Sequence, residues 1–519
     1  MLTLSVPSID PARQHTGETR PKAVAAWLER LPFASPVDSA QQLVTALYAL
    51  NRRPLDEGAR TTLQALVRPV VARVSASLET LLAESGVPPH AQQRQIGALL
   101  RELQIEHSIG YKHLLLALTG HRFGLPHSRR TAEITAQLQA ALRDIQTACH
   151  LTHTPLPAGL WQEMHALHAY AQASNQADHA AGEAPSPSLA YRQALLIALA
   201  DPPHMSHAEI IHTRRYLDLF AGQAQLLTAP VPTHRGFSIQ TDGDTAPGYF
   251  SASPRPGSLW LDTDALCRQL YETIMQLRAG ATPRRLGLPP DMESEFGQTL
   301  CKRLLKQWSS GAARAFKRYA TPGRTVQAVA GVSAIHRLLE DAPQAQLDPD
   351  EAGDQSIHVI EPALAAPVAV NTTEWSGSND SAAGLALSGA PDAPLNLKVG
   401  DPLAVRAGDA AEWSLGVIRW IRMRDARQVE LGVERLSPQV QPVWVRPLLG
   451  GKTPEPALFV PGLPALKQND RLLLPRHLYQ IGMDAEVWRT QRLYTLTFGR
   501  RFEHTPSFDL IDFTVFAES

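Results

Sequence analysis

An asparagine, a serine and a glycine stand at the spacing N-x-S-x-x-G in Asn379, Ser381 and Gly384, just before an alternating apolar run. An Asn amide and a Ser hydroxyl each donate and accept hydrogen bonds, and glycine lets backbone approach a ligand closely. The same residue types are also typical of an ordinary polar turn. The pattern therefore indicates either a turn or a loop that contacts a polar ligand.

Two groups of histidines are the other candidates for chemistry, in "HALHAY" (His165, His168) and "HMSHAEIIH" (His204, His207, His212). Without a carboxylate at helical spacing, as in H-E-x-x-H, we expect packed or surface histidines here and no metal site. The sequence also lacks a P-loop, a G-x-S-x-G elbow and a strand followed by G-x-G-x-x-G. These observations disfavour an enzyme and predict no cofactor.

Length and charge limit the remaining function classes. The 519 residues are too many for one core and suggest two to four domains. The 49 basic and 50 acidic residues give a formal net charge of −1, so no overall field attracts a nucleic acid polymer or anionic lipid. Any binding site must therefore be local.

The number of cysteines and the hydropathy of the chain indicate the cellular compartment of the protein. The three cysteines, Cys149, Cys267 and Cys301, are far apart and fit reduced thiols better than a disulfide framework or a zinc site. The first residues lack a basic region followed by an apolar one, and no run of about 18 apolar residues occurs. We therefore expect a cytoplasmic protein without a membrane span.

Residues 1–312 have the periodicity of amphipathic helices, including "GARTTLQALVRPVVARVSASLETLLAES" and a helix over about 206–227. Prolines and glycines mark the breaks between them. Short alternating runs at 233–262 predict a small β insert. This part of the chain is predicted to be a helical array or bundle.

From "RTVQAVAGVSAIHRLL" onward the alternation has a period of two, which predicts short strands and a small antiparallel barrel over 313–450. Residues 340–372 are acidic and rich in Pro and Ala, and are interpreted as an inserted loop. A second β-rich segment follows over 451–519. Its "NDRLLLPR" is similar to "GDPLAVR" upstream, which indicates either two related β modules or shared turn chemistry.

Residues of about 314–450 resemble a PilZ domain, a small β-barrel that in many members binds cyclic di-GMP. The resemblance rests on N-x-S-x-x-G at Asn379, Ser381 and Gly384, followed by "VGDPLAVR", "WSLGVIRW" and "ELGVERL". Together with the helical periodicity upstream, it predicts a multidomain α+β chain, with an N-terminal all-α helical array or bundle that carries a small β insert and C-terminal antiparallel β-barrels of PilZ type.

The family also carries two arginines at R-x-x-x-R just before its first strand. That spacing occurs at Arg314 and Arg318. If the arginines are instead placed by their distance from the predicted first strand, the pair is Arg318 and Arg324. We favour this second pair and keep Arg314 as the reserve candidate. A guanidinium offers a planar donor fork for phosphate oxygens or for the O6/N7 edge of guanine, and it stacks on base planes. The alternative is that these cations only cap the preceding helix.

The resemblance implies a cytosolic bacterial receptor that binds cyclic di-GMP at the barrel and couples binding to a protein partner through its helical domain. The alternative is a PilZ-like adaptor or scaffold that has lost nucleotide binding. Trp375, Trp413, Trp420 and Trp444 could stack on bases, although alternating tryptophans more often fill a barrel core.

Overall fold

The computed structural model describes most of the chain as two compact units. One unit comprises residues 1–85 and 89–313, and the other comprises residues 86–88 and 314–519. The described residues are 2–9, 18–83, 85–87, 89–120, 129–180, 184–229, 236–249, 257–289, 292, 294–309, 319–340, 370, 372–381, 384–390, 395–408, 410, 412–425, 427–449, 453–462, 468–490 and 492–518.

In the described part of the first unit, eight α-helices precede the first strand. They are α1 (Pro21–Glu29), α2 (Pro36–Asn51), α3 (Glu57–Leu82), α4 (Ala91–Gly120), α5 (Arg129–Leu151), α6 (Leu160–Ala173), α7 (Pro187–Leu199) and α8 (His207–Phe220). Side chains at their starts satisfy backbone N–H groups that have no partner within the helix. The Asp56 carboxylate accepts from the Ala59 N–H at 2.9 Å, and Ser206 and Glu209 form a reciprocal capping box at α8.

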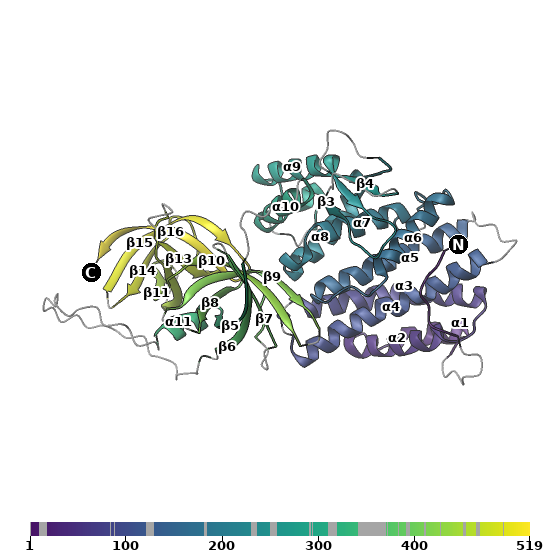
Figure 1. The fold of residues 1–519 in the computed structure, drawn as a ribbon, viewed down its shortest axis with the longest axis horizontal. Coiled ribbons are helices and arrows are strands. Elements are labelled where there is room, and N and C mark those ends of the chain that lie inside the picture. Colours follow the sequence, from purple (N-terminus) through teal and green to yellow (C-terminus); the bar gives the residue numbers. More distant parts are fainter. Residues whose placement is uncertain are drawn as a thin grey trace. The chain divides into compact units, whose positions relative to one another are not determined.

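The core of this unit is a continuous apolar cluster to which all eight helices contribute. Helix α4 is central, because it packs against α2, α3 and α5 (Figure 1). Its inward side chains Leu100, Leu103, Leu114 and Leu115 are almost completely buried. Burial of this apolar stripe, more than intrinsic helix propensity, stabilises such a helix.

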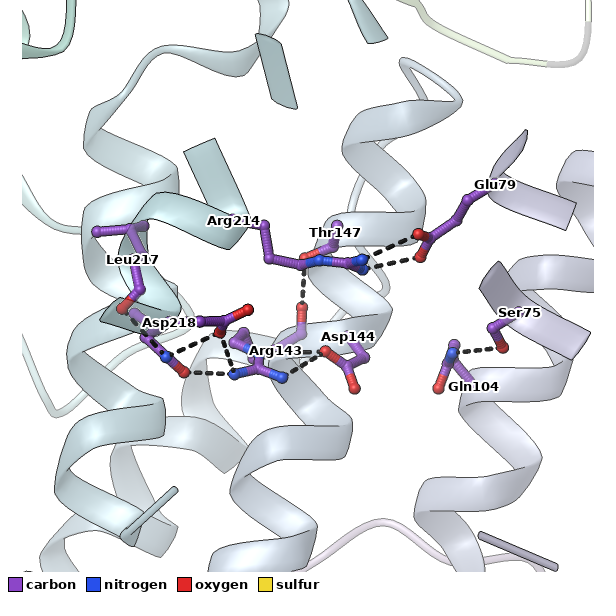
Figure 2. Close-up of polar contacts among 10 residues, drawn as sticks. Ser75, Glu79, Gln104, Arg143, Asp144, Thr147, Arg214, Leu217 and Asp218 are labelled. Atoms are coloured by element: carbon purple, nitrogen blue, oxygen red, sulfur yellow. Dashed lines mark hydrogen bonds and ion pairs between the residues drawn. The ribbon is translucent and has the colours of Figure 1, made fainter. Parts of the chain in front are cut away.

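Charged and polar side chains also connect the helices. Figure 2 shows Arg214 on α8 donating to both carboxylate oxygens of Glu79 on α3, at 2.8 and 3.0 Å. In the same region Arg143 on α5 contacts Asp144 at 2.8 Å and also donates to Gln193 on α7. Both side chains of the Arg214–Glu79 pair are largely buried. The pair therefore links two helices that are far apart in the sequence.

A four-stranded sheet and two further helices follow in the first unit. The sheet has the order β1-β4-β2-β3, with β1 (Gln225–Leu227), β2 (Phe237–Ile239), β3 (Gly248–Tyr249) and β4 (Leu259–Asp262). Helices α9 (Asp264–Arg278) and α10 (Ser294–Ser309) come next and pack together. The helix predicted over 206–227 is wrong at its end, because α8 stops at Phe220 and residues 225–227 pair with β4.

The second unit contains two closed antiparallel barrels of six strands each (Figure 1). The first has the order β10-β7-β6-β5-β8-β9. Its strands are β5 (Tyr319–Ala330), β6 (Thr373–Ser381), β7 (Gly384–Gly389), β8 (Pro402–Ala407), β9 (Ser414–Met423) and β10 (Val429–Ser437). Inward-facing residues such as Trp375, Leu403, Ile418 and Leu431 fill its core.

One segment predicted as strand is a helix. After β5 the chain turns at Gly331, which has a positive φ of 91°, and continues as α11 (Val332–Glu340). Val332, Ile335 and Leu339 follow helical spacing and pack as one apolar face. The period-two interpretation of "RTVQAVAGVSAIHRLL" is therefore wrong beyond Ala330, because a glycine in the left-handed region ends the strand.

The second barrel has the order β11-β12-β13-β16-β15-β14. Its strands are β11 (Gln441–Pro447), β12 (Glu455–Val460), β13 (Arg471–Pro475), β14 (Asp484–Arg489), β15 (Arg492–His504) and β16 (Phe508–Glu518). Its first strand begins before residue 451, where the sequence suggested that the second β-rich segment starts. The barrel has its own core, with Val445, Leu472, Ala485 and Ile511 fully buried.

The two barrels have the same strand connectivity. In each, the first strand pairs with the second and the fourth, the third with the second and the sixth, and the fifth with the fourth and the sixth. The similar segments "GDPLAVR" and "NDRLLLPR" do not occupy equivalent places, because they form the fourth strand (β8) and the third strand (β13) of their barrels. The repetition lies in the topology and not in those two segments.

A shared apolar cluster joins the barrels. It includes Leu415 and Val417 of the first barrel and Leu473 and Phe508 of the second, all fully buried. Arg419 of β9 pairs with Glu503 of β15, and Ser507 donates to Asp401 just before β8. The barrels are therefore packed against each other as one body.

Candidate ligand-binding site

A cavity of about 520 Å³ opens on the wall of the first barrel. Strands β5, β6, β8 and β10 form most of it, and the residue Gln468, just before β13, closes one side. Its charged and amide-bearing lining residues are Arg324, Asn379, Asp380, Glu412, Arg435 and Gln468. Apolar side chains such as Val326, Leu385 and Val405 form the remainder. This mixture suits a ligand with flat apolar surfaces and several polar groups.

The predicted motif begins on this wall. Asn379 is half-buried and lines the cavity, and its neighbour Asp380 does so as well. Successive residues of a regular strand point to opposite faces, but β6 is irregular here, with a register shift between Gly377 and Asn379 against β7. The irregularity therefore lies directly before the two consecutive polar residues that line the cavity.

The other two motif residues form the turn beside the cavity. The Ser381 hydroxyl accepts from the Gly384 N–H at 3.2 Å and donates to the Gly384 carbonyl at 3.0 Å. A Cβ on Gly384 would lie 2.3 Å from the Val433 carbonyl oxygen on β10, so only glycine fits there. Neither residue lines the cavity. The structure thus uses Ser381 and Gly384 to hold the strand ends that carry Asn379.

Of the three predicted arginines, Arg324 is the one that lies within the described residues. Arg324 is exposed on β5, lines the cavity and lies opposite Gly377 of β6. Strand β5 shifts its register between Ala320 and Arg324, so this strand too is irregular where it reaches the cavity. Arg314 and Arg318 lie outside the described residues. Arg324 and Asn379, predicted from separate motifs, therefore share one cavity.

An ion pair that sequence reasoning missed lies on the same wall. One guanidinium nitrogen of Arg435 donates to both carboxylate oxygens of Asp380, at 2.8 and 3.0 Å. Arg435 belongs to β10 and Asp380 to β6, with β7 between them in the sheet. Arg435 stands in the quoted segment "ELGVERL", and two consecutive charges there could have indicated a strand irregularity. A register shift does occur between Arg435 and Ser437.

The tryptophans have mainly structural positions. Trp375 and Trp413 are buried in the apolar clusters, so they do not line the cavity. Trp444 donates its indole N–H to the Glu340 carboxylate at 2.8 Å, and Trp420 is half-buried. Base stacking by Trp375 or Trp413 would need the core to open.

The histidines of "HALHAY" are packed within the helical unit. His165 Nδ1 lies 2.6 Å from the Tyr191 hydroxyl, and the ring of His168 stacks on the Tyr191 ring. Burial lowers the pKa of His168 to about 4, so this side chain is neutral at physiological pH. Among the described residues, no group of three or more His, Cys, Asp or Glu is placed to hold a metal ion.

Among the described residues, no helix combines the length and the apolar character that crossing a membrane demands.

Family models match almost the whole chain. The model for the N-terminal domain of the cyclic-di-GMP receptor FimW matches residues 22–232. The model for the middle PilZ domain of FimW matches residues 237–345 and 365–442, and that for its C-terminal β-barrel domain matches residues 443–516. The match to the middle PilZ domain thus begins at residue 237, in the four-stranded sheet that belongs to the first unit.

A curated relative is similar over nearly its whole length. The cyclic-di-GMP receptor FimW of Pseudomonas aeruginosa PAO1 is 26% identical, over 99% of this chain and 93% of the relative. The family models follow one another as an N-terminal domain, a middle PilZ domain and a C-terminal β-barrel domain, and the residues that they match here form mainly helices first, then the first barrel and then the second barrel. The chain therefore belongs to the PilZ domain family, with a helical domain before its PilZ barrel and a second β-barrel after it.

Proposed function

We propose that this protein is a receptor for cyclic di-GMP and binds it in the cavity on the PilZ barrel. The observation that carries the proposal is that Arg324, Asn379 and Arg435 line one cavity of about 520 Å³. The name of the relative from P. aeruginosa, a cyclic-di-GMP receptor, supports it. Pockets of about 300–1,000 Å³ are typical of small-molecule sites.

The lining offers the groups that a guanine dinucleotide needs. Each phosphate of the ligand carries a negative charge, which Arg324 or Arg435 can bind through charge-assisted hydrogen bonds. Asn379 can hydrogen-bond the guanine edge through its amide. The apolar side chains Val326 and Leu385 provide surface against which a base can pack. The roles of Arg314 and Arg318 remain those implied by the family motif.

We further propose that the helical unit transmits the binding event to a protein partner in the cytoplasm, and that the protein is not an enzyme. Ligand contacts to Arg324 on β5, and to Arg318 as the family motif implies, would hold the start of the first barrel strand in one arrangement. A ligand that binds one arrangement of such a segment better than another shifts the equilibrium between them.

One observation favours the second candidate, an adaptor without nucleotide binding. Arg435 is already paired with Asp380, and Glu412 lies on the same cavity, so the described charges on the wall balance. An anionic ligand must compete with Asp380 for this guanidinium. Such a site would bind weakly, or not at all if Arg324 alone could not hold the phosphates.

Calorimetric titration of the purified full chain distinguishes the two candidates. The receptor predicts saturable binding of cyclic di-GMP with a Kd below about 100 µM, an order-of-magnitude ceiling for a useful sensor. Cyclic di-AMP and GMP are the matched controls and should bind at least about tenfold more weakly, because the adenine edge and the single phosphate lose contacts. A flat titration with cyclic di-GMP would favour the adaptor.

A further inference from the structure

The second barrel contributes a residue to the cavity of the first. Gln468 lies three residues before β13, the third strand of the second barrel, yet it lines the cavity together with Arg324, Asn379 and Arg435. The cavity therefore has walls from both barrels. Sequence reasoning could not find this residue, because it stands in a separate β-rich segment with no binding motif of its own.

Equivalent parts of the two barrels meet here. In the first barrel, the ends of the second and third strands, β6 and β7, carry Asn379, Asp380 and Leu385 to the cavity. Because the two barrels share one connectivity, β12 and β13 are the equivalent second and third strands. Gln468 precedes β13, so it occupies the corresponding connection. Each barrel thus contributes described residues close to the end of its second strand or the start of its third strand to the same cavity.

Local contacts fix the backbone that carries Gln468. The Gly462 N–H, just after β12, donates to the Asp470 carboxylate at 2.7 Å. A Cβ on Gly462 would lie 2.4 Å from the Gln468 carbonyl oxygen, so the two ends of the connection approach closely at a glycine. The shared core and the Arg419–Glu503 ion pair hold this barrel against the first. The position of Gln468 relative to Arg324 is therefore set by rigid elements.

The amide of Gln468 suits the proposed ligand. It carries two donor hydrogens and an accepting oxygen, so it can pair with a base edge or a phosphate oxygen without adding charge. We propose that Gln468 contacts the nucleotide, and that the receptor site is composite, with the second barrel supplying one wall. This inference rests on the proposed function, and it adds that both barrels sense the same ligand.

Substitution of Gln468 in the full chain tests the inference by calorimetry with cyclic di-GMP. Gln468→Ala should weaken binding about three- to tenfold, the loss expected for one hydrogen bond. Gln468→Met keeps the length of the side chain but not its amide, and should weaken binding similarly. Asn469→Ala is the matched control, because Asn469 is the exposed neighbour and does not line the cavity. It should leave affinity unchanged.

The outcomes separate this inference from the proposed function. Wild-type affinity in both Gln468 variants, when the unsubstituted protein binds, would overturn the composite site and leave the receptor function standing. Wild-type affinity in Gln468→Met alone would overturn the amide contact. An equal loss in Asn469→Ala would show that the connection matters only for folding. A wild-type protein that does not bind at all would overturn both proposals.

Discussion

Asp380 accepts from one guanidinium nitrogen of Arg435 through both carboxylate oxygens, at 2.8 and 3.0 Å, on the wall of the PilZ-barrel cavity. The two residues lie on strands that are separated by β7 in the sheet and by 55 positions in the chain. A cation suited to phosphate is thus paired with a carboxylate next to the motif residue Asn379. A phosphate that binds Arg435 in the proposed site must therefore compete with the Asp380 carboxylate.

Removal of the negative charge should strengthen nucleotide binding. In Asp380→Asn, Arg435 loses its ionic partner, and the net charge of the cavity wall rises by one. Because the pair is partly exposed, we expect an affinity for cyclic di-GMP about two- to fivefold higher. Glu374→Gln, an exposed position on the same strand, is the control and should have no such effect. Weaker binding by Asp380→Asn would mean that the carboxylate itself contacts the ligand.

Arg324 should be required for tight binding. Arg324→Ala removes a charge-assisted contact worth roughly 1.5–3 kcal/mol, which corresponds to about ten- to a hundredfold in the Kd measured by calorimetry. Arg314→Ala separates the two possible arginine registers. If Arg314→Ala abolishes binding and Arg324→Ala does not, the literal R-x-x-x-R pair is the binding pair and the register proposed here is wrong.

Gly384 should be required for the first barrel to fold well. In Gly384→Ala the new Cβ would lie 2.3 Å from the Val433 carbonyl oxygen, so the strands must separate. We expect a loss of about 1–3 kcal/mol in the free energy of unfolding, measured with urea. Gly408→Ala is the control, since the nearest atom to its Cβ is 3.7 Å away. Equal stability of the two variants would contradict the observed strand pairing.

The Arg214–Glu79 pair should stabilise the helical unit. Glu79→Ala leaves a largely buried guanidinium without its two hydrogen bonds, which costs about 1.5–3 kcal/mol. Glu133→Ala removes the exposed Arg129–Glu133 pair, which lies on one helix face and should contribute less than about 0.5 kcal/mol. Chemical denaturation of both variants measures the difference. A smaller loss in Glu79→Ala than in Glu133→Ala would contradict the buried network in Figure 2.

Acid should destabilise the helical unit before carboxylates titrate. Burial lowers the pKa values of His107, His150 and His168 from about 6.5 to about 4, so between these values the unfolded chain binds protons that the folded chain does not. Stability is therefore fully present above about pH 6.5 and falls as the pH decreases toward 4. Each histidine contributes a slope of up to about 1.4 kcal/mol per pH unit.

One substitution assigns this slope to a residue. His168→Phe keeps an aromatic ring against Tyr191 and removes a titrating group, so the pH slope of the unfolding free energy should become shallower. The unsubstituted protein, measured in parallel, gives the reference slope. Identical slopes in the two proteins between pH 5 and 6.5 would show that His168 is not buried in its neutral form.

The sequence was sufficient to predict the fold class, because period-two alternation and helical spacing are local signals. Two elements were interpreted wrongly for reasons that are also physical. The strand pattern of "TVQAVA" is followed without a visible break by the helical spacing that begins after Gly331, so the helix is interpreted as strand. The residues after α8 are interpreted as helix, because β1 is recognised only by its pairing with β4. Such boundaries depend on partners that a single segment does not reveal.

The candidate site was less accessible to sequence reasoning. The motif spacing indicated Asn379 and the strand register indicated Arg324, and the structure places both on one cavity. Ser381 looked like a ligand donor, but its hydroxyl is used within the turn. Arg435 and Gln468 reach the cavity through long-range strand pairing and barrel packing. No local pattern marks residues that tertiary structure brings together.

A crystal structure of the full chain with saturating cyclic di-GMP tests the proposed receptor site most directly. It should show the nucleotide in the cavity of the first barrel, with Arg324 and Asn379 in contact with it and the Arg435 guanidinium turned from Asp380 toward a phosphate. Nucleotide bound elsewhere on the protein, or an empty cavity with the Arg435–Asp380 pair intact, would contradict the site proposed here.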